Sequence, residues 1–215
     1  MIIAVDGPAA SGKGTLAAGL AQHYGLPHLD TGLLYRAVGR AVAELDGTPG
    51  FEAAAVAAAR SIDPGALDPE LLSTGEVGQL ASKVAVIGAV REALFDFQRA
   101  FATQAGGAVL DGRDIGTRIA PDAEVKLFIQ ADSKARMERR ARQFERKGLP
   151  VDRYALYHQI EERDARDMAN PNGGFYPAAD AHLLDTTLLD IEAALRAAVA
   201  IVDGVMVEKS RSGRT

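Results

Sequence analysis

The 215-residue sequence predicts an α/β fold, a doubly wound parallel sheet of about five strands with helices on both faces. The first observation is that short apolar runs alternate with longer segments of helical periodicity. The second is that runs such as residues 2–5 are apolar throughout, which is typical of strands buried on both faces. The third is a glycine-containing loop, residues 7–12, between the first strand and the first helix. These observations leave the order of the strands open.

The first two predicted strands are each followed by a helix. Residues 2–5 form the first strand, and the pattern predicts a helix over residues 15–24. Gly25 comes next, in the position where glycine commonly ends helices. A second short strand is predicted at residues 27–30, followed by a helix from about 32 to 45.

The middle of the chain predicts an insertion and one long helix. Residues 46–75 contain three prolines and several glycines around an alanine-rich helix near 51–60, a composition typical of an insertion. A single helix is predicted from residue 77 to about 103, ended by the glycines at 106 and 107. Its apolar stripe consists of Leu80, Val84, Ile87, Val90, Leu94 and Phe101.

The rest of the chain predicts three more strands, at residues 108–111, 124–131 and 181–185. Residues 132–170 are highly charged and helical, with a break at 148–150. The last helix is predicted at residues 188–202. The polar, glycine-containing residues 208–215 are expected to form a flexible tail.

Composition and charge narrow the class of protein. Lysine and arginine total 24 against 29 acidic residues, so the net charge is −5 and a generally basic surface for nucleic acid is not expected. The absence of cysteine excludes disulfides, iron–sulfur clusters and a cysteine nucleophile, and the histidines lack metal-ligand spacing. No apolar run reaches the ~18–20 residues that span a bilayer, and the N-terminal apolar stretch ends at Asp6, unlike a signal peptide. We expect a cytoplasmic protein without membrane or nucleic-acid partners, and nothing demands more than a monomer.

The loop after the first strand predicts a phosphate-binding cradle. Its G-x4-G-K spacing is that of a P-loop, in which backbone N–H groups, a helix N-terminus and a mobile lysine surround phosphate oxygens. The residue after the lysine is Gly14, and the hydroxyl is delayed to Thr15, which weakens a direct hydroxyl–magnesium bond. The alternative is a chance glycine-rich turn. The predicted cradle consists of Gly7, Pro8, Ala9, Ala10, Ser11, Gly12, Lys13, Gly14 and Thr15.

Polar residues also follow two other predicted strands. Asp111 ends the strand at 108–111, where an aspartate would reach the magnesium shell of a P-loop site, in part through water. An alternating basic and acidic pair follows between two glycines, which a polar turn with a local ion pair would also explain. Thr31 and Tyr35 lie four residues apart at the other junction and share a helical face, although Asp30 or Thr31 could simply cap the helix.

Eight arginines fall within residues 132–170. For most of them a solvated helix with i,i+4 ion pairs is the simpler interpretation. Arginines around a transferring phosphoryl group would also suit the chemistry, because its charge spreads over the equatorial oxygens. Arg163 and Asp167 lie four residues apart on one face, and they could hold a sugar hydroxyl and a phosphate, or only each other.

Taken together, these motifs resemble the bacterial cytidylate kinases, of the nucleoside-monophosphate kinase group, from about residue 2 to residue 201. The cradle alone indicates only a P-loop kinase, whereas D-G-R-D-I-G-T with the other motifs is far narrower. The resemblance rests on G-P-A-A-S-G-K-G-T at 7–15, L-D-T-G-L-L-Y-R at 29–36, A-S-K-V-A at 81–85, V-R-E-A-L at 90–94, Q-R-A-F at 98–101, D-G-R-D-I-G-T at 111–117, P-D-A at 121–123, K-G at 147–148, E-R-D-A-R-D at 162–167 and P-A-A-D-A at 177–181.

This resemblance implies transfer of the γ-phosphoryl group of ATP to CMP or dCMP with Mg²⁺. It implies that Ser82, Arg91 and Asp114 read the cytosine, which offers a donor at N4 and acceptors at N3 and O2. Arg163 and Asp167 would hold the ribose and phosphates. The monophosphate would be positioned by Thr31, Tyr35, Arg36 and Arg113. The catalytic set is then Lys13, Arg113, Arg163 and Asp111, with Thr15 and Asp111 toward the metal.

The implied organisation is one P-loop kinase domain over residues 1–207. Its core comprises residues 1–45, 77–131 and 171–207, with a monophosphate-side insert at about 46–76 and a lid at about 132–170.

Two departures from the family stand out. Asn170 occupies the position where relatives carry an arginine facing the acceptor phosphate, and Arg166 is a candidate substitute. The insert is short, with no alternating strands where relatives often have a small antiparallel sheet. Two other functions remain open at this point, a small P-loop kinase for another nucleotide or metabolite and a nucleotide-binding module without turnover.

Overall fold

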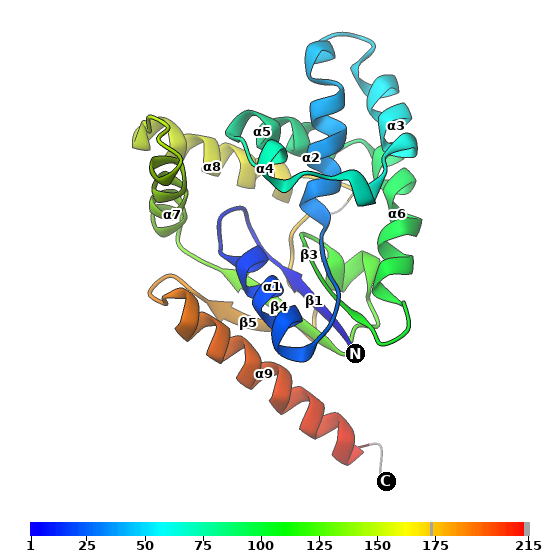
Figure 1. The fold of residues 1–215 in the computed structure, drawn as a ribbon, viewed down its shortest axis with the longest axis vertical. Coiled ribbons are helices and arrows are strands. Elements are labelled where there is room, and N and C mark those ends of the chain that lie inside the picture. Colours follow the sequence, from blue (N-terminus) through cyan, green and yellow to red (C-terminus); the bar gives the residue numbers. More distant parts are fainter. Residues whose placement is uncertain (173, 213–215) are drawn as a thin grey trace.

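A single parallel sheet with the strand order β2-β3-β1-β4-β5 lies at the centre of the fold (Figure 1). The computed structural model describes residues 1–172 and 174–212. The strands are β1 (Ile2–Asp6), β2 (His28–Asp30), β3 (Ala108–Gly112), β4 (Val125–Gln130) and β5 (His182–Asp185). Every neighbouring pair is parallel, so the carboxyl ends of all the strands meet along one edge. The predicted fold class is confirmed.

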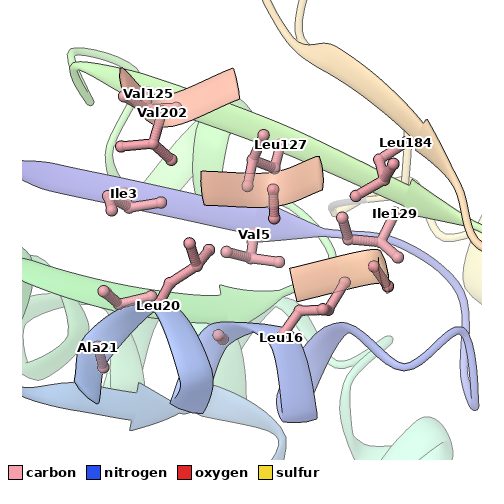
Figure 2. Packing of buried hydrophobic residues seen from close by; sticks show 14 residues of the cluster. Ile3, Val5, Leu16, Leu20, Ala21, Val125, Leu127, Ile129, Leu184 and Val202 are labelled. Atoms are coloured by element: carbon pink, nitrogen blue, oxygen red, sulfur yellow. The ribbon is translucent and has the colours of Figure 1, made fainter. Parts of the chain in front are cut away.

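One face of the sheet is covered by α1 (Lys13–Tyr24) and α9 (Ile191–Ser212). Figure 2 shows Leu16 and Leu20 of α1 pointing toward β1 in the cluster that these helices form with the sheet. The opposite face packs against α6 (Gly88–Ala102) and a short π-helical turn, η3 (Ile115–Ile119). Burial on both faces explains why β1, β3 and β4 are largely apolar in sequence.

A layer of helices lies above the sheet in Figure 1. Its long members, α2 (Thr31–Ala41), α3 (Phe51–Ser61) and α5 (Gly75–Val84), share a buried cluster with α6. The shorter pieces are η1 (Ala43–Leu45), η2 (Pro64–Ala66) and α4 (Pro69–Leu72). Residues 46–75 thus contain helices and turns without a strand, as the sequence predicts.

The single helix predicted over residues 77–103 is wrong, because the chain turns at residues 85–87 and forms α5 and α6 instead. The apolar stripe continues across this turn, so periodicity gives no sign of it. The carbonyls of Ala85 and Val86 accept hydrogen bonds from the side-chain amides of Asn170 (3.0 Å) and Asn172 (2.9 Å). Side chains distant in sequence therefore stabilise the break.

The charged region forms a helical hairpin of α7 (Ser133–Arg146) and α8 (Arg153–Met168), and the predicted break between them is confirmed. The hairpin has its own small apolar cluster, built around Met137, Ala141, Leu156 and Ile160. We call this hairpin the lid.

The last helix was predicted at residues 188–202 and differs at both ends, because α9 runs from Ile191 to Ser212. Val205 and Met206 pack against the same cluster as the rest of the helix, which extends it. Residues 208–212 of the predicted tail are therefore helical, and residues 213–215 lie outside the described structure. Among the described residues, no helix has both the length and the apolar character to cross a membrane.

Candidate active site

The loop between β1 and α1 has the backbone geometry of a phosphate cradle. Gly7 has φ +149°, and a Cβ on it would lie 2.1 Å from the carbonyl oxygen of Ile129, so no side chain fits there. Gly12 (φ +92°) and Ala10 (φ +59°) also adopt left-handed conformations, which is unusual for alanine. The loop leads directly into α1, whose N-cap Gly12 offers no side chain to the first amides. The free N–H groups and the helix dipole favour an anion at this point.

Two adjoining cavities lie beside this loop. The larger, about 160 Å³, is lined by Ala9, Ala10, Lys13 and Gly14 of the loop, by α2, α5 and β3, and by both lid helices. The smaller, about 70 Å³, lies between α2, α5, α6, the end of β3 and α8. Lys13, Arg113 and Arg163 line both cavities, so a ligand in each would meet at these three cations.

The larger cavity has an excess of positive charge. Its cationic side chains are Lys13, Arg36, Arg113, Arg140 and Arg163. In the described part of the chain its carboxylates are only Asp30 and Asp111. Burial, and next the Arg113 guanidinium, lower the pKa of Lys13 to about 8 and that of Arg163 to about 9. Burial, and next Arg36, lower the pKa of Arg140 to about 10. Burial and mutual repulsion thus outweigh the nearby carboxylates, and phosphate groups would supply further negative charge.

Two carboxylates face each other across the ends of β2 and β3, where Asp30 pairs with Asp111 in the strand register. Asp30 caps α2 by accepting from the Gly32 amide (2.9 Å), and burial, then Asp111, raise the pKa of Asp30. Asp111 is buried and accepts from His28 Nε2 at 2.9 Å. The Thr31 hydroxyl donates to the Asp111 carbonyl (2.8 Å), which fixes the start of α2 against β3.

The smaller cavity contains a buried ion pair between Arg91 of α6 and Asp114, the residue before η3. The Arg91 guanidinium lies over the Tyr35 ring, 5.6 Å from its centroid. Asp6, at the end of β1, accepts from the amides of Ile115 and Gly116 at 2.8 Å each and so holds the turn that presents Asp114. Burial raises the pKa of Asp6 to about 7.

A second polar group lies at the junction of the two cavities. Asp167 accepts from the Ser82 hydroxyl (2.8 Å) and from Arg113 Nε (3.0 Å), and its Oδ2 is 3.7 Å from Arg163 Nε. Burial tends to raise the pKa of Asp167, but the neighbouring guanidinium groups of Arg113 and Arg163 outweigh it and lower the pKa overall. The alternative of a local ion pair between residues 113 and 114 is not what the structure shows, since Arg113 pairs with Asp167 and Asp114 with Arg91.

Most of the predicted substrate residues therefore come together. All but Arg36 line the smaller cavity: Thr31, Tyr35, Ser82, Arg91, Arg113, Asp114, Arg163 and Asp167. Arg36 lines the larger one and donates to the carbonyls of Leu72 (2.8 Å) and Thr74 (3.3 Å).

Other predicted positions lie outside the cavity linings. Four residues of the predicted cradle line neither cavity: Gly7, Pro8, Ser11 and Gly12. The buried Ser11 hydroxyl has no hydrogen-bond partner among the described residues. Thr15, predicted toward the metal, is exposed on α1. Arg166, considered as a substitute for the missing arginine, lines neither cavity and donates to Gln79 (3.2 Å). Asn170 lines the smaller cavity.

Sequence reasoning missed Arg140 and His28. Arg140 lies over the Phe144 ring (4.8 Å) and faces the larger cavity, and it donates a hydrogen bond to Gln143 (3.0 Å). The i,i+4 spacing of Arg140 and Phe144 was available as a signal, but seven other arginines in the same region obscured it. His28 gave no signal, because only strand pairing brings it to Asp111.

Two further arginines fasten the lid to the loop rather than face the cavities. Arg136 donates to the Ala9 carbonyl (3.1 Å) and pairs with Asp164 (2.5 Å). Arg139 donates to the Ser11 carbonyl (3.2 Å) and to the Thr186 hydroxyl (3.0 Å). Both guanidinium groups thus bridge α7 and the cradle.

The comparisons with known proteins agree with this geometry. The family model described as "Cytidylate kinase" matches residues 3–203. A cytidylate kinase from Xanthobacter autotrophicus is 55% identical over 214 residues, with all of both chains covered. One from Nitrobacter winogradskyi is 50% identical over the same length and coverage. A solved structure of an uncharacterised protein from Eubacterium ventriosum superposes with a TM-score of 0.56 at 18% identity, covering 94% of this chain and 98% of that one, which is a likeness of fold. The chain belongs to the cytidylate kinase family.

Proposed function

We propose that the protein transfers the γ-phosphoryl group of ATP to CMP or dCMP and so produces CDP or dCDP. The observation that carries this proposal is the pair of adjoining cavities, one rich in cations beside the cradle and one containing the Arg91–Asp114 pair. Family membership supports the same reaction. The finer assignments of ligands and residues below are part of the proposal.

The larger cavity suits the triphosphate of ATP. Backbone amides of the cradle would bind phosphate oxygens, and Lys13 can follow the β- and γ-phosphates as a mobile point charge. Arg36, Arg113, Arg140 and Arg163 lie around the same space, where the charge of a loose phosphoryl-transfer transition state develops. The buried Arg163 Nε has no hydrogen-bond partner among the described residues and would be satisfied by such an anion.

The smaller cavity suits cytosine and its ribose. A carboxylate at Asp114 can accept from the N4 amino group while Arg91 donates to N3 or O2. The buried Arg91 Nε, also without a partner among the described residues, supplies another donor in the pocket. Uracil exchanges the donor and acceptor at positions 4 and 3, so it would leave these buried groups unpaired. Ser82 and Asp167 lie where a ribose hydroxyl could reach them.

Mg²⁺ fits the carboxylates of this site. Among the described residues no group of three or more His, Asp or Glu side chains is placed to hold a metal ion. Magnesium in kinases is usually held by one or two carboxylates plus substrate phosphates and water, and Asp111 and Asp30 offer such a pair beside Lys13 and Gly14. When bound, the ion would neutralise charge on the donor phosphates. Thr15 is exposed on α1 and lines neither cavity, so the geometry gives it no such role.

The reaction needs positioning and electrostatics more than acid–base chemistry. The acceptor phosphate and the γ-phosphoryl group would meet between the two cavities, where Lys13, Arg113 and Arg163 are shared. Because both lid helices line the donor cavity, the lid would exclude water, so that the phosphoryl group reaches the nucleotide and not solvent.

A coupled assay of nucleoside-diphosphate formation tests this proposal. ATP and Mg²⁺ are supplied with CMP, dCMP, UMP, AMP or GMP, each at several concentrations. We expect CMP and dCMP to have the highest kcat/KM values, with UMP far below. A faster reaction with UMP, AMP or GMP would contradict the assignment of the base pocket, and ATP binding without CDP formation would contradict the kinase itself.

A further inference from the structure

His28 lies outside every motif that carries the family resemblance, yet its side chain contacts an aspartate that lines the larger cavity. It is on β2, and its imidazole Nε2 lies 2.9 Å from Oδ1 of the buried Asp111 at the end of β3. Its side chain is 24% exposed, against 3% for that of Asp111. In the described part of the chain, no other group forms a hydrogen bond with either Asp111 carboxylate oxygen.

Only one oxygen of Asp111 has a hydrogen-bond partner among the described residues. Both oxygens lie near Gly14, with Oδ2 3.6 Å and Oδ1 4.0 Å from where a Cβ on that glycine would be, but Oδ1 is engaged by His28 and Oδ2 is left for a ligand. Asp111 and Gly14 both line the larger cavity. The neighbouring Asp30 also has one oxygen held by a donor, because the Gly32 amide donates to its Oδ1 at 2.9 Å. Each carboxylate thus has one oxygen fixed by a donor from the β2–α2 segment.

A fixed oxygen matters because the terminal torsion of an aspartate is broad and sets the direction of both oxygens. A carboxylate that must rotate before it meets a cation loses affinity, and donors behind such ligands commonly contribute 10–100-fold to metal affinity. The carboxylate only accepts, so Nε2 must carry the hydrogen in this contact. Nδ1 is not needed for it.

We infer that His28 is a positioning residue, which donates from Nε2 to Asp111 and holds its second oxygen toward the magnesium–nucleotide complex. The inference rests on the proposed function, because that function places Mg²⁺ and the donor phosphates in the larger cavity. The inference adds to the proposed function a residue of β2 that acts through Asp111 rather than on the substrate.

Two substitutions separate the hydrogen bond from simple packing. Glutamine carries its amide nitrogen about as far from the backbone as the histidine Nε2, whereas the asparagine amide falls one bond short. H28Q should therefore keep the contact and H28N should lose it, although both remain polar. His182 is exposed on β5, so H182Q and H182N are matched controls.

The Mg²⁺ concentration that gives half-maximal CDP formation is measured for each variant at saturating ATP and CMP. Mn²⁺ binding in the presence of ADP is measured separately, from the electron-paramagnetic-resonance signal of free Mn²⁺. We expect H28N to need on the order of tenfold more of either ion, with an unchanged KM for CMP. H28Q and both His182 variants should match the wild type, and thermal melting should show that all four are folded.

Equal ion requirements for H28N and the wild type would overturn the inference, and so would equal losses in H28Q and H28N. If the wild type formed no CDP from CMP, the proposed function would fail, while the Mn²⁺ titration would still decide the role of His28.

Discussion

The lowered pKa of Lys13 should make nucleotide binding in the larger cavity depend on pH. Burial and the Arg113 guanidinium lower its pKa from 10.5 to about 8, while Asp111 acts in the opposite direction. A bound triphosphate would bring negative charge next to the ammonium and raise that pKa again. At a pH where the Lys13 amine of the free enzyme is deprotonated, binding of the triphosphate is therefore accompanied by uptake of a proton.

The affinity for ATP should accordingly be nearly constant below pH 8 and fall above it. Each further pH unit should weaken binding by up to tenfold, until the pH reaches the pKa of Lys13 in the complex. Calorimetric titration with ATP between pH 7 and 9 measures this. In K13M the dissociation constant should be higher throughout and lose this slope; a slope that persists in K13M would assign the proton to another group.

At Asp114 we predict a loss of acceptor use rather than of donor binding. D114N keeps the shape of the side chain but removes the charge opposite the buried Arg91 and one acceptor for cytosine N4. Leaving a buried partner unpaired costs roughly 2–5 kcal/mol, so kcat/KM for CMP should fall by about 10²-fold or more. The dissociation constant for ATP should change much less.

D122N is the matched control for D114N, because Asp122 also pairs with an arginine, Arg99, but at the surface. It should leave CMP use nearly unchanged. Equal loss of CMP and ATP binding in D114N would move Asp114 out of the base pocket.

At the scale of elements, the lid uses its arginines in different ways although they look alike in sequence. Arg136 and Arg139 fasten α7 to the cradle, and Arg153 forms exposed pairs with Glu138 and Glu145. Arg140 and Arg163 face the larger cavity. The expectation of a solvated helix with i,i+4 ion pairs therefore fails for the four arginines that are tied to the cradle or the cavity. Arg153 is exposed as expected, but it pairs between the two helices and not at i,i+4.

Arg140 should contribute to turnover at a small cost to the stability of the free enzyme. R140M keeps an apolar stem against Phe144 and removes a guanidinium that burial and Arg36 destabilise. We expect kcat to fall by about 10²-fold, as when one preorganised donor is removed from a transition state. The melting temperature without nucleotide should stay the same or rise.

R146M, on the same helix, is the control for R140M, since Arg146 is exposed and bonds only its own helix at Arg142 among the described residues. It should leave kcat unchanged. If R140M instead melted lower with normal kcat, Arg140 would be a packing residue.

What could be predicted from the sequence follows from how local each signal is. The cradle was predictable because its strand, glycines, lysine and helix are consecutive. The apolar runs predicted β1, β3 and β4 because these central strands are buried on both faces. The turn at residues 85–87 was not predictable. Its carbonyls accept hydrogen bonds from Asn170 and Asn172, which follow the lid in sequence and lie more than 80 positions away. His28 and Arg140 acquire partners only when strands pair and helices pack.

At the scale of the whole molecule, the buried apolar side chains among the described residues form four clusters rather than one. Two lie on the faces of the sheet, one joins α2, α3, α5 and α6, and one lies inside the lid. The lid cluster is the smallest, with four buried residues against fourteen in the cluster of α1 and α9. The lid is held to the cradle by hydrogen bonds, such as those that Arg136 and Arg139 donate to loop carbonyls. Such a part can open while the sheet stays intact.

Hydrogen exchange should reveal this division. Without nucleotides, amides of α7 and α8 should exchange faster than those of β1, β3 and α1, because less apolar burial opposes their opening. ATP should slow exchange in the lid and in residues 9–15, since its proposed cavity is lined by both lid helices and the cradle. CMP should mainly protect α5, the start of α6 and residues 111–116, which surround the smaller cavity. Protection by ATP confined to α9 and β5, with the lid unaffected, would place the donor elsewhere and remove the basis for a closing lid.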